Sequence, residues 1–70
     1  MRHAIVIEKA SSNYAAYVPD LPGCIATGAS VQETESLIRE AIEFHLEGLK
    51  ADGLPVPTAT SQVEYIDVPA

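Results

Sequence analysis

The 70-residue chain lacks the covalent staples on which many domains of its size depend. Cys24 is its one cysteine, so no internal disulfide can form, and a lone thiol without a secretion signal is typical of a reducing compartment. The apolar run near the N-terminus is four residues long, too short for a signal peptide or a membrane span. We therefore expect a cytoplasmic protein without membrane association.

Basic residues are scarce as well: four Lys and Arg stand against ten Asp and Glu, a formal charge of −6. Because nucleic-acid affinity comes largely from basic side chains that neutralise phosphates, direct nucleic-acid binding is not expected. His3 and His45 lack metal-ligand spacing, and no phosphate-cradling glycine loop occurs. We expect neither a metal nor a cofactor. The acidic balance favours a basic partner, although small acidic domains are also simply soluble.

Length limits the fold to a single domain, residues 1–70. A chain this short buries only about 60% of the surface that its unfolded form exposes, so its hydrophobic core is marginal. With disulfides excluded and metal ligands lacking, association with another chain is the expected source of extra stability.

Alternation of side chains predicts three strands in the first half of the chain. His3–Lys9 and Tyr14–Val18 are rich in apolar and aromatic residues and are separated by "ASSN", whose small residues suit a hairpin connection. Cys24–Ala29 is the third strand, and Gly28 within it indicates a bulge or a close backbone approach. The three strands are expected to form an antiparallel meander.

A helix follows from Val31 to about Lys50. Ser30 and Glu33 stand at capping-box spacing, and Gly53 is placed to end the helix in a left-handed conformation. Its apolar positions recur with helical period on one stripe: Leu37, Ile38, Ala41, Ile42, His45, Leu46 and Leu49. The opposite face is acidic: Glu33, Glu35, Glu40, Glu43 and Glu47. The simplest explanation for that face is that it is solvated, and the alternative is that it is a docking surface for a basic protein.

After a connector stiffened by Pro55 and Pro57, the stretch "QVEYIDV" alternates like a fourth strand. The predicted class is α+β in the order β-β-β-α-β, with one amphipathic helix on one face of the sheet and the last strand beside the first. One helix covers one face, yet the strands are apolar on both faces. A second polypeptide is therefore expected to cover the rest.

The corner "PDLPG", Pro19–Gly23, is rigid by composition. Each proline fixes its own φ and keeps the preceding residue extended, and Gly23 is free to take positive φ. Asp20 can hydrogen-bond its own backbone two residues on. The sequence leaves open whether the corner is only a hinge or also contacts a partner.

These features together resemble the HicB-type antitoxins. The resemblance is carried by "YAAYVPDLPGCIATGASVQE" and "AIEFHLEGLKADGLPVP", and it covers nearly the whole chain. It implies a partial ribonuclease-H-like fold and an antitoxin that binds a small basic ribonuclease toxin and blocks its catalytic surface. Family members are typically oligomeric, so a homo-oligomer, dimer or tetramer, is expected. Many relatives also carry a C-terminal DNA-binding segment, which this sequence lacks.

The expected partner contacts are therefore the corner, as a rigid presenting element, and the acidic residues of the helix: Pro19, Asp20, Leu21, Pro22, Gly23, Glu40, Glu43 and Glu47. Two alternatives remain. One is a self-associating orphan regulatory domain without a toxin. The other is a residual metal-dependent nuclease that uses Glu8, Asp20 or Asp67. The first strand carries no acid at its centre, which favours a scaffold without catalysis and a protein that is not an enzyme.

Overall fold

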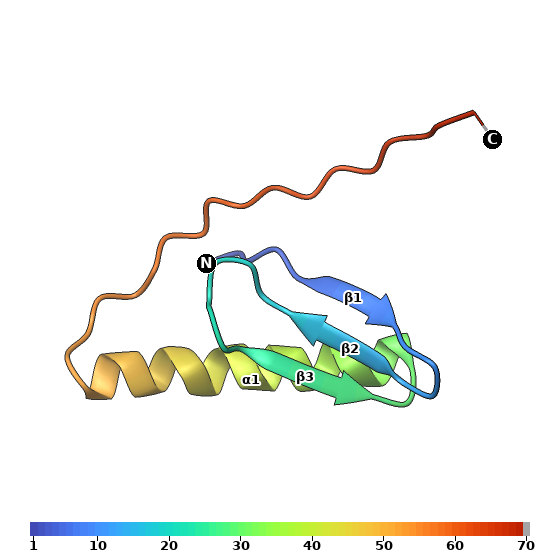
Figure 1. Cartoon of the computed structure of the whole chain (residues 1–70). Helices are drawn as coiled ribbons and strands as arrows, with labels where there is room; N and C mark the ends of the chain where they lie inside the picture. Colours follow the sequence, from blue (N-terminus) through green and yellow to red (C-terminus); the bar gives the residue numbers. More distant parts are fainter. Residues whose placement is uncertain (70) are drawn as a thin grey trace.

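The computed structural model describes residues 1–69 and shows three strands followed by one helix (Figure 1). The elements are β1 (Val6–Lys9), β2 (Tyr14–Tyr17), β3 (Ile25–Gly28) and α1 (Val31–Ala51). β2 is central and pairs antiparallel with both neighbours. α1 packs across one face of this sheet, so the predicted α+β class is confirmed.

The first strand is shorter than predicted, because it begins at Val6 and not at His3. Val6 pairs with Tyr17, the last residue of β2. Beyond Tyr17 the chain enters the corner, where Pro19 has no N–H to donate to a ladder. Within the described part of the chain, residues 3–5 consequently have no strand beside them on the β2 side.

Both ends of α1 are capped as the sequence predicts. The Ser30 hydroxyl accepts a hydrogen bond from the Glu33 N–H at 3.0 Å, while the Glu33 carboxylate accepts from the Ala29 N–H at 2.9 Å, one residue earlier than in a standard capping box. At the other end Gly53 has φ +68°. The Leu54 N–H donates to the Leu49 carbonyl and the Gly53 N–H to the Lys50 carbonyl, which is a Schellman motif.

The core lies between α1 and the helix-facing side of the sheet. Its buried apolar residues are Ala16, Val18, Leu21, Cys24 and Ile38. Thr34 is also fully buried, and its hydroxyl donates to the Ser30 carbonyl at 2.7 Å. The Gly28 backbone packs directly against Thr34, because a Cβ on Gly28 would stand 2.6 Å from Thr34 Oγ1. The close backbone approach predicted at Gly28 is confirmed.

The predicted fourth strand is wrong for the single chain. Residues 62–69, called the tail from here on, run as a stretched trace in Figure 1 but pair with no strand among the described residues. The alternating pattern predicts an extended backbone correctly, but a strand also needs an edge to pair with. Figure 1 shows the tail passing the N-terminus and running away from the sheet.

Candidate partner-binding surface

The corner, residues 19–23, is built around one core side chain. Leu21 has no exposed surface, and its N–H donates to the Val18 carbonyl at 3.1 Å. The Cys24 N–H in turn donates to the Leu21 carbonyl at 3.1 Å, and Gly23 takes φ +83°. Pro19, Pro22 and Gly23 are exposed around this anchor. Leu21 is therefore structural, and its neighbours form a fixed surface.

Asp20 holds the segment that leads into the tail. Instead of bonding its own turn, its carboxylate accepts four hydrogen bonds from residues forty positions away. One oxygen accepts from the N–H groups of Thr60 at 3.0 Å and Ser61 at 2.9 Å. The other accepts from the Ser61 hydroxyl at 2.8 Å and the Thr60 hydroxyl at 3.3 Å. We call these three residues the latch.

The latch also sets the acidity of its carboxyl group. The hydrogen bonds from the Ser61 N–H and hydroxyl, with a smaller contribution from Thr60, hold the pKa of Asp20 below its ordinary value of 3.8. Partial desolvation opposes this shift but does not cancel it. Asp20 is consequently ionised, and the latch closed, at neutral pH.

A groove of about 460 Å³ lies between the corner, the start of β3 and the C-terminal half of α1. Two of its lining residues are large, apolar and exposed to solvent: Phe44 is 79% exposed and Ile25 is 69% exposed. The lining residues, which define the β3-side groove, are Gly23, Cys24, Ile25, Ala41, Phe44, His45, Gly48, Leu49 and Asp52. Sequence reasoning missed Phe44, although an aromatic residue off the apolar stripe of an amphipathic helix is a signal for an exposed contact.

Cys24 forms part of the floor of this groove and is 4% exposed. Desolvation raises the pKa of its thiol, so the reactive thiolate is disfavoured. Cys24 is therefore a small apolar residue of the core.

The predicted acidic contacts lie elsewhere on α1. Glu40 and Glu43 line a polar depression on the helix together with Glu35 and Arg39, which form an exposed ion pair at 3.1 Å. Glu47 is exposed one turn further along. The corner thus shares a groove with Phe44 but does not line a pocket with these glutamates. The structure offers two neighbouring surfaces of α1, one apolar and one acidic.

The carboxylates considered for a nuclease are not brought together. Glu8 lies on β1 and is exposed, Asp20 is occupied in the latch, and Asp67 lies in the exposed tail. Within residues 1–69 no three metal-ligating side chains gather at one place. The same residues contain no helix with the length and apolarity that crossing a bilayer demands.

The face of the sheet opposite α1 carries an apolar row. Val6, Tyr17 and Ile25 are cross-strand partners and therefore share one face, while Ile7, Ala16 and Ala26 share the face that packs on the core. Tyr17 is 42% exposed. The expectation that one helix leaves apolar sheet surface uncovered is confirmed for this row.

A three-stranded meander crossed by one long helix, with exposed apolar and acidic surfaces, defines a small α+β domain. The chain belongs to the HicB-like antitoxin family of bacterial toxin-antitoxin systems, whose family model matches residues 3–70. The resemblance seen in the sequence is thereby confirmed. The family is named for antitoxins and not for an enzymatic activity.

Relatives come from a phage and from cellular organisms. An uncharacterized 14.9 kDa protein from the rep-hol intergenic region of Haemophilus phage HP1 is 38% identical over 69 residues, which are 99% of this chain and 52% of the phage protein. A UPF0150 protein of Helicobacter pylori is 49% identical over 49 residues, which are 70% of this chain and 68% of the relative. The chain thus spans about half the length of the phage relative.

A solved structure supports the same assignment. A chain of the HicA3 and HicB3 toxin-antitoxin complex matches with a TM-score of 0.73 and 28% identity, covering 86% of this chain and 70% of that one. The fold described above is therefore the fold of a component of a toxin-antitoxin complex.

Proposed function

We propose that this chain is an antitoxin that binds a small, basic, HicA-type ribonuclease toxin in the cytoplasm and occludes its catalytic surface. The observation that carries the proposal is the structural match to a chain of a toxin-antitoxin complex over 86% of the present chain. The formal charge of −6 supports a basic partner, because complementary charge steers encounter.

The proposal assigns different tasks to the two surfaces of α1. The β3-side groove supplies the apolar anchor, since exposed aromatic side chains such as Phe44 are enriched among residues that dominate binding energy. The acidic face with Glu40, Glu43 and Glu47 attracts the toxin and orients it. The corner presents Gly23 at the rim of the groove, held in place by the buried Leu21.

The test is a binding titration against the short basic protein encoded beside this chain in its native genome. Phe44→Ser is expected to raise the dissociation constant by roughly a hundredfold, the scale of losing one aromatic anchor. The triple variant Glu40→Lys, Glu43→Lys, Glu47→Lys is expected to slow association mainly and to weaken its dependence on salt.

The matched pair of single reversals is Glu40→Lys and Glu64→Lys: the first should slow association, whereas the second changes an exposed acid in the tail and should leave the association rate nearly unaltered. Wild-type chain that gives no complex with the basic protein would leave the orphan regulatory domain as the better explanation. The proposal includes self-association as a dimer or tetramer and no direct contact with nucleic acid.

A further inference from the structure

The tail is an apolar segment without a place to pack. Its side chains Val63, Tyr65, Ile66 and Val68 are 47%, 93%, 81% and 74% exposed. Residues with this composition are typical of buried strands. The tail therefore has the composition of a strand but no paired strand beside it among the described residues.

The solvent-accessible area of the chain shows how much surface remains exposed beyond that of a compact domain. A compact monomer of 7.5 kDa is expected to expose about 4,200 Å², whereas this chain exposes 5,481 Å². Its radius of gyration is 13.7 Å, against about 11 Å for a compact domain of this length. The surplus area exceeds the roughly 800 Å² that each partner buries in a stable interface.

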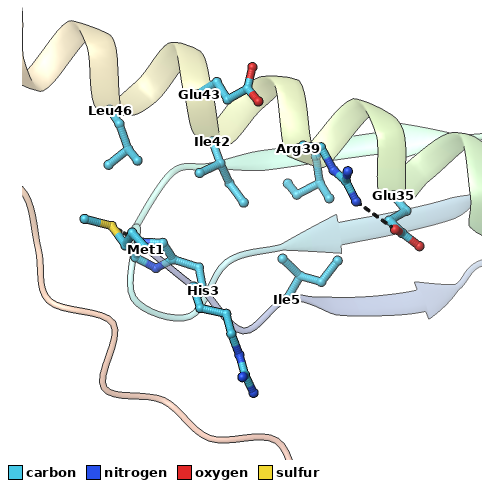
Figure 2. Close-up of a pocket in the computed structure, with 10 residues that line it drawn as sticks. Met1, His3, Ile5, Glu35, Arg39, Ile42, Glu43 and Leu46 are labelled. Atoms are coloured by element: carbon cyan, nitrogen blue, oxygen red, sulfur yellow. Dashed lines mark hydrogen bonds and ion pairs between the residues drawn. The ribbon is translucent and has the colours of Figure 1, made fainter.

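A receiving site of matching character exists along β1. Among residues 1–69 the outer edge of β1 pairs with no strand, and beside it α1 and the N-terminal segment form a mainly apolar groove of about 430 Å³ that Glu35, Arg39 and Glu43 also line. Figure 2 shows Ile42 and Leu46 pointing from α1 toward Met1, His3 and Ile5. We call this the N-terminal groove.

His3 gives independent evidence that the N-terminal groove lacks a hydrogen-bonding partner. Its Nδ1 atom is buried and has no hydrogen-bond partner among the described residues, although buried polar atoms are nearly always paired. The backbone of an added strand beside residues 3–5 would supply such a partner.

The chain's own tail does not turn into this site. After the latch at Thr60 and Ser61, the backbone passes residues 2–4 and continues straight, away from β1 (Figure 1). Between Ser61 and Val68 there is no Gly, Pro or Asn to support a sharp reversal. A straight strand that leaves one sheet is suited to reach another.

We propose that two copies of this chain exchange their tails, so that residues 62–68 of each add a strand to the β1 edge of the other and cover its N-terminal groove. The exchange is reciprocal, as expected for an isologous twofold dimer. The latch fixes where each tail departs. This inference does not depend on a toxin.

The test combines the oligomeric state with amide hydrogen exchange on the 70-residue chain. The wild type is expected to be a concentration-dependent dimer by sedimentation equilibrium, with slowed exchange at residues 62–68. The double variant Tyr65→Ser, Ile66→Ser is expected to be a folded monomer whose tail exchanges freely, because both side chains are already exposed in the single chain.

Phe44→Ser is the matched control, since it also removes an apolar group, 79% exposed, but outside the proposed contact. It should dimerise like wild type while binding the toxin roughly a hundredfold more weakly, so the two proposals fail separately. A monomer with a protected tail would mean closure on the chain's own sheet and would overturn the exchange. A dimer insensitive to the double variant, or one with an unprotected tail, would overturn it equally.

Discussion

Gly28 shows how one absent side chain fixes the distance between sheet and helix. The Thr34 N atom and Cα lie 2.9 Å and 3.1 Å from the place where a Gly28 Cβ would stand, so backbone atoms of α1 would have to move. Thr34 is fully buried and bonded to Ser30, which leaves it no room to give way. The contact between β3 and the first turn of α1 therefore depends on a residue without a Cβ.

Gly28→Ala is expected to lower the free energy of unfolding by about 1–3 kcal/mol, the usual cost of overpacking a filled site. The measurement is urea denaturation followed by circular dichroism. Gly48→Ala is the control: it lies in α1 with nothing within 4 Å of its Cβ position, and should be neutral or stabilising by about 0.5–1 kcal/mol. Equal stability of the Gly28 variant and wild type would refute the close-approach argument.

Residues also differ in how well sequence alone assigns them. The Ser30 cap, Gly53 and the apolar stripe of α1 are predictable because they act within one element. The partners of Asp20 are not, because Thr60 and Ser61 meet it only after the helix and connector are placed. Phe44 is visible as an aromatic residue off the stripe, but its neighbours Gly23 and Ile25 come from other elements.

At the element scale, the latch ties the segment after α1 to the corner. α1 is about 31 Å long and the strands only about 14 Å, so the helix carries the chain past the sheet and the connector must return. The Asp20 carboxylate receives that returning segment. Its anchoring is electrostatic, and so it depends on pH.

The latch is expected to open in acid. The pKa of Asp20 is lower in the folded chain than in the unfolded one, so its contribution is complete above the ordinary value of 3.8 and is lost as the pH falls through the lower folded value. The measurement is an NMR titration of the Thr60 and Ser61 amide signals between neutral pH and pH 2. Both signals should shift together with a midpoint below that of a free aspartate.

Asp20→Asn serves as the comparison, because its amide has one acceptor oxygen and does not titrate in this range. In that variant the Thr60 and Ser61 signals should lose the transition. A wild-type midpoint at or above the ordinary aspartate value would contradict the four-bond latch.

The fourth strand marks the limit of pattern reasoning at the element scale. Its alternating residues predict extended backbone, and the backbone is extended. What the pattern cannot supply is the edge, which is a property of the assembled molecule and not of residues 62–68 themselves.

At the scale of the whole molecule, the structure is a small sheet packed on one helix, and its apolar surfaces are covered to different degrees. One sheet face is packed by α1, the other carries the exposed side chains of Tyr17 and Ile25 beside the half-buried Val6, and the tail extends away. Sequence predicted that a second polypeptide is needed, from the count of one helix against two apolar faces. The sequence does not tell whether that polypeptide is a second copy of the chain or a toxin, because either partner would bind to exposed apolar groups.

The most direct test of the antitoxin function is a titration of the neighbouring basic protein's RNA cleavage with this chain. We predict that cleavage falls linearly and reaches zero at a fixed molar ratio, since a bound antitoxin buries the catalytic surface. Undiminished cleavage in the presence of a saturating, correctly folded chain would contradict the account.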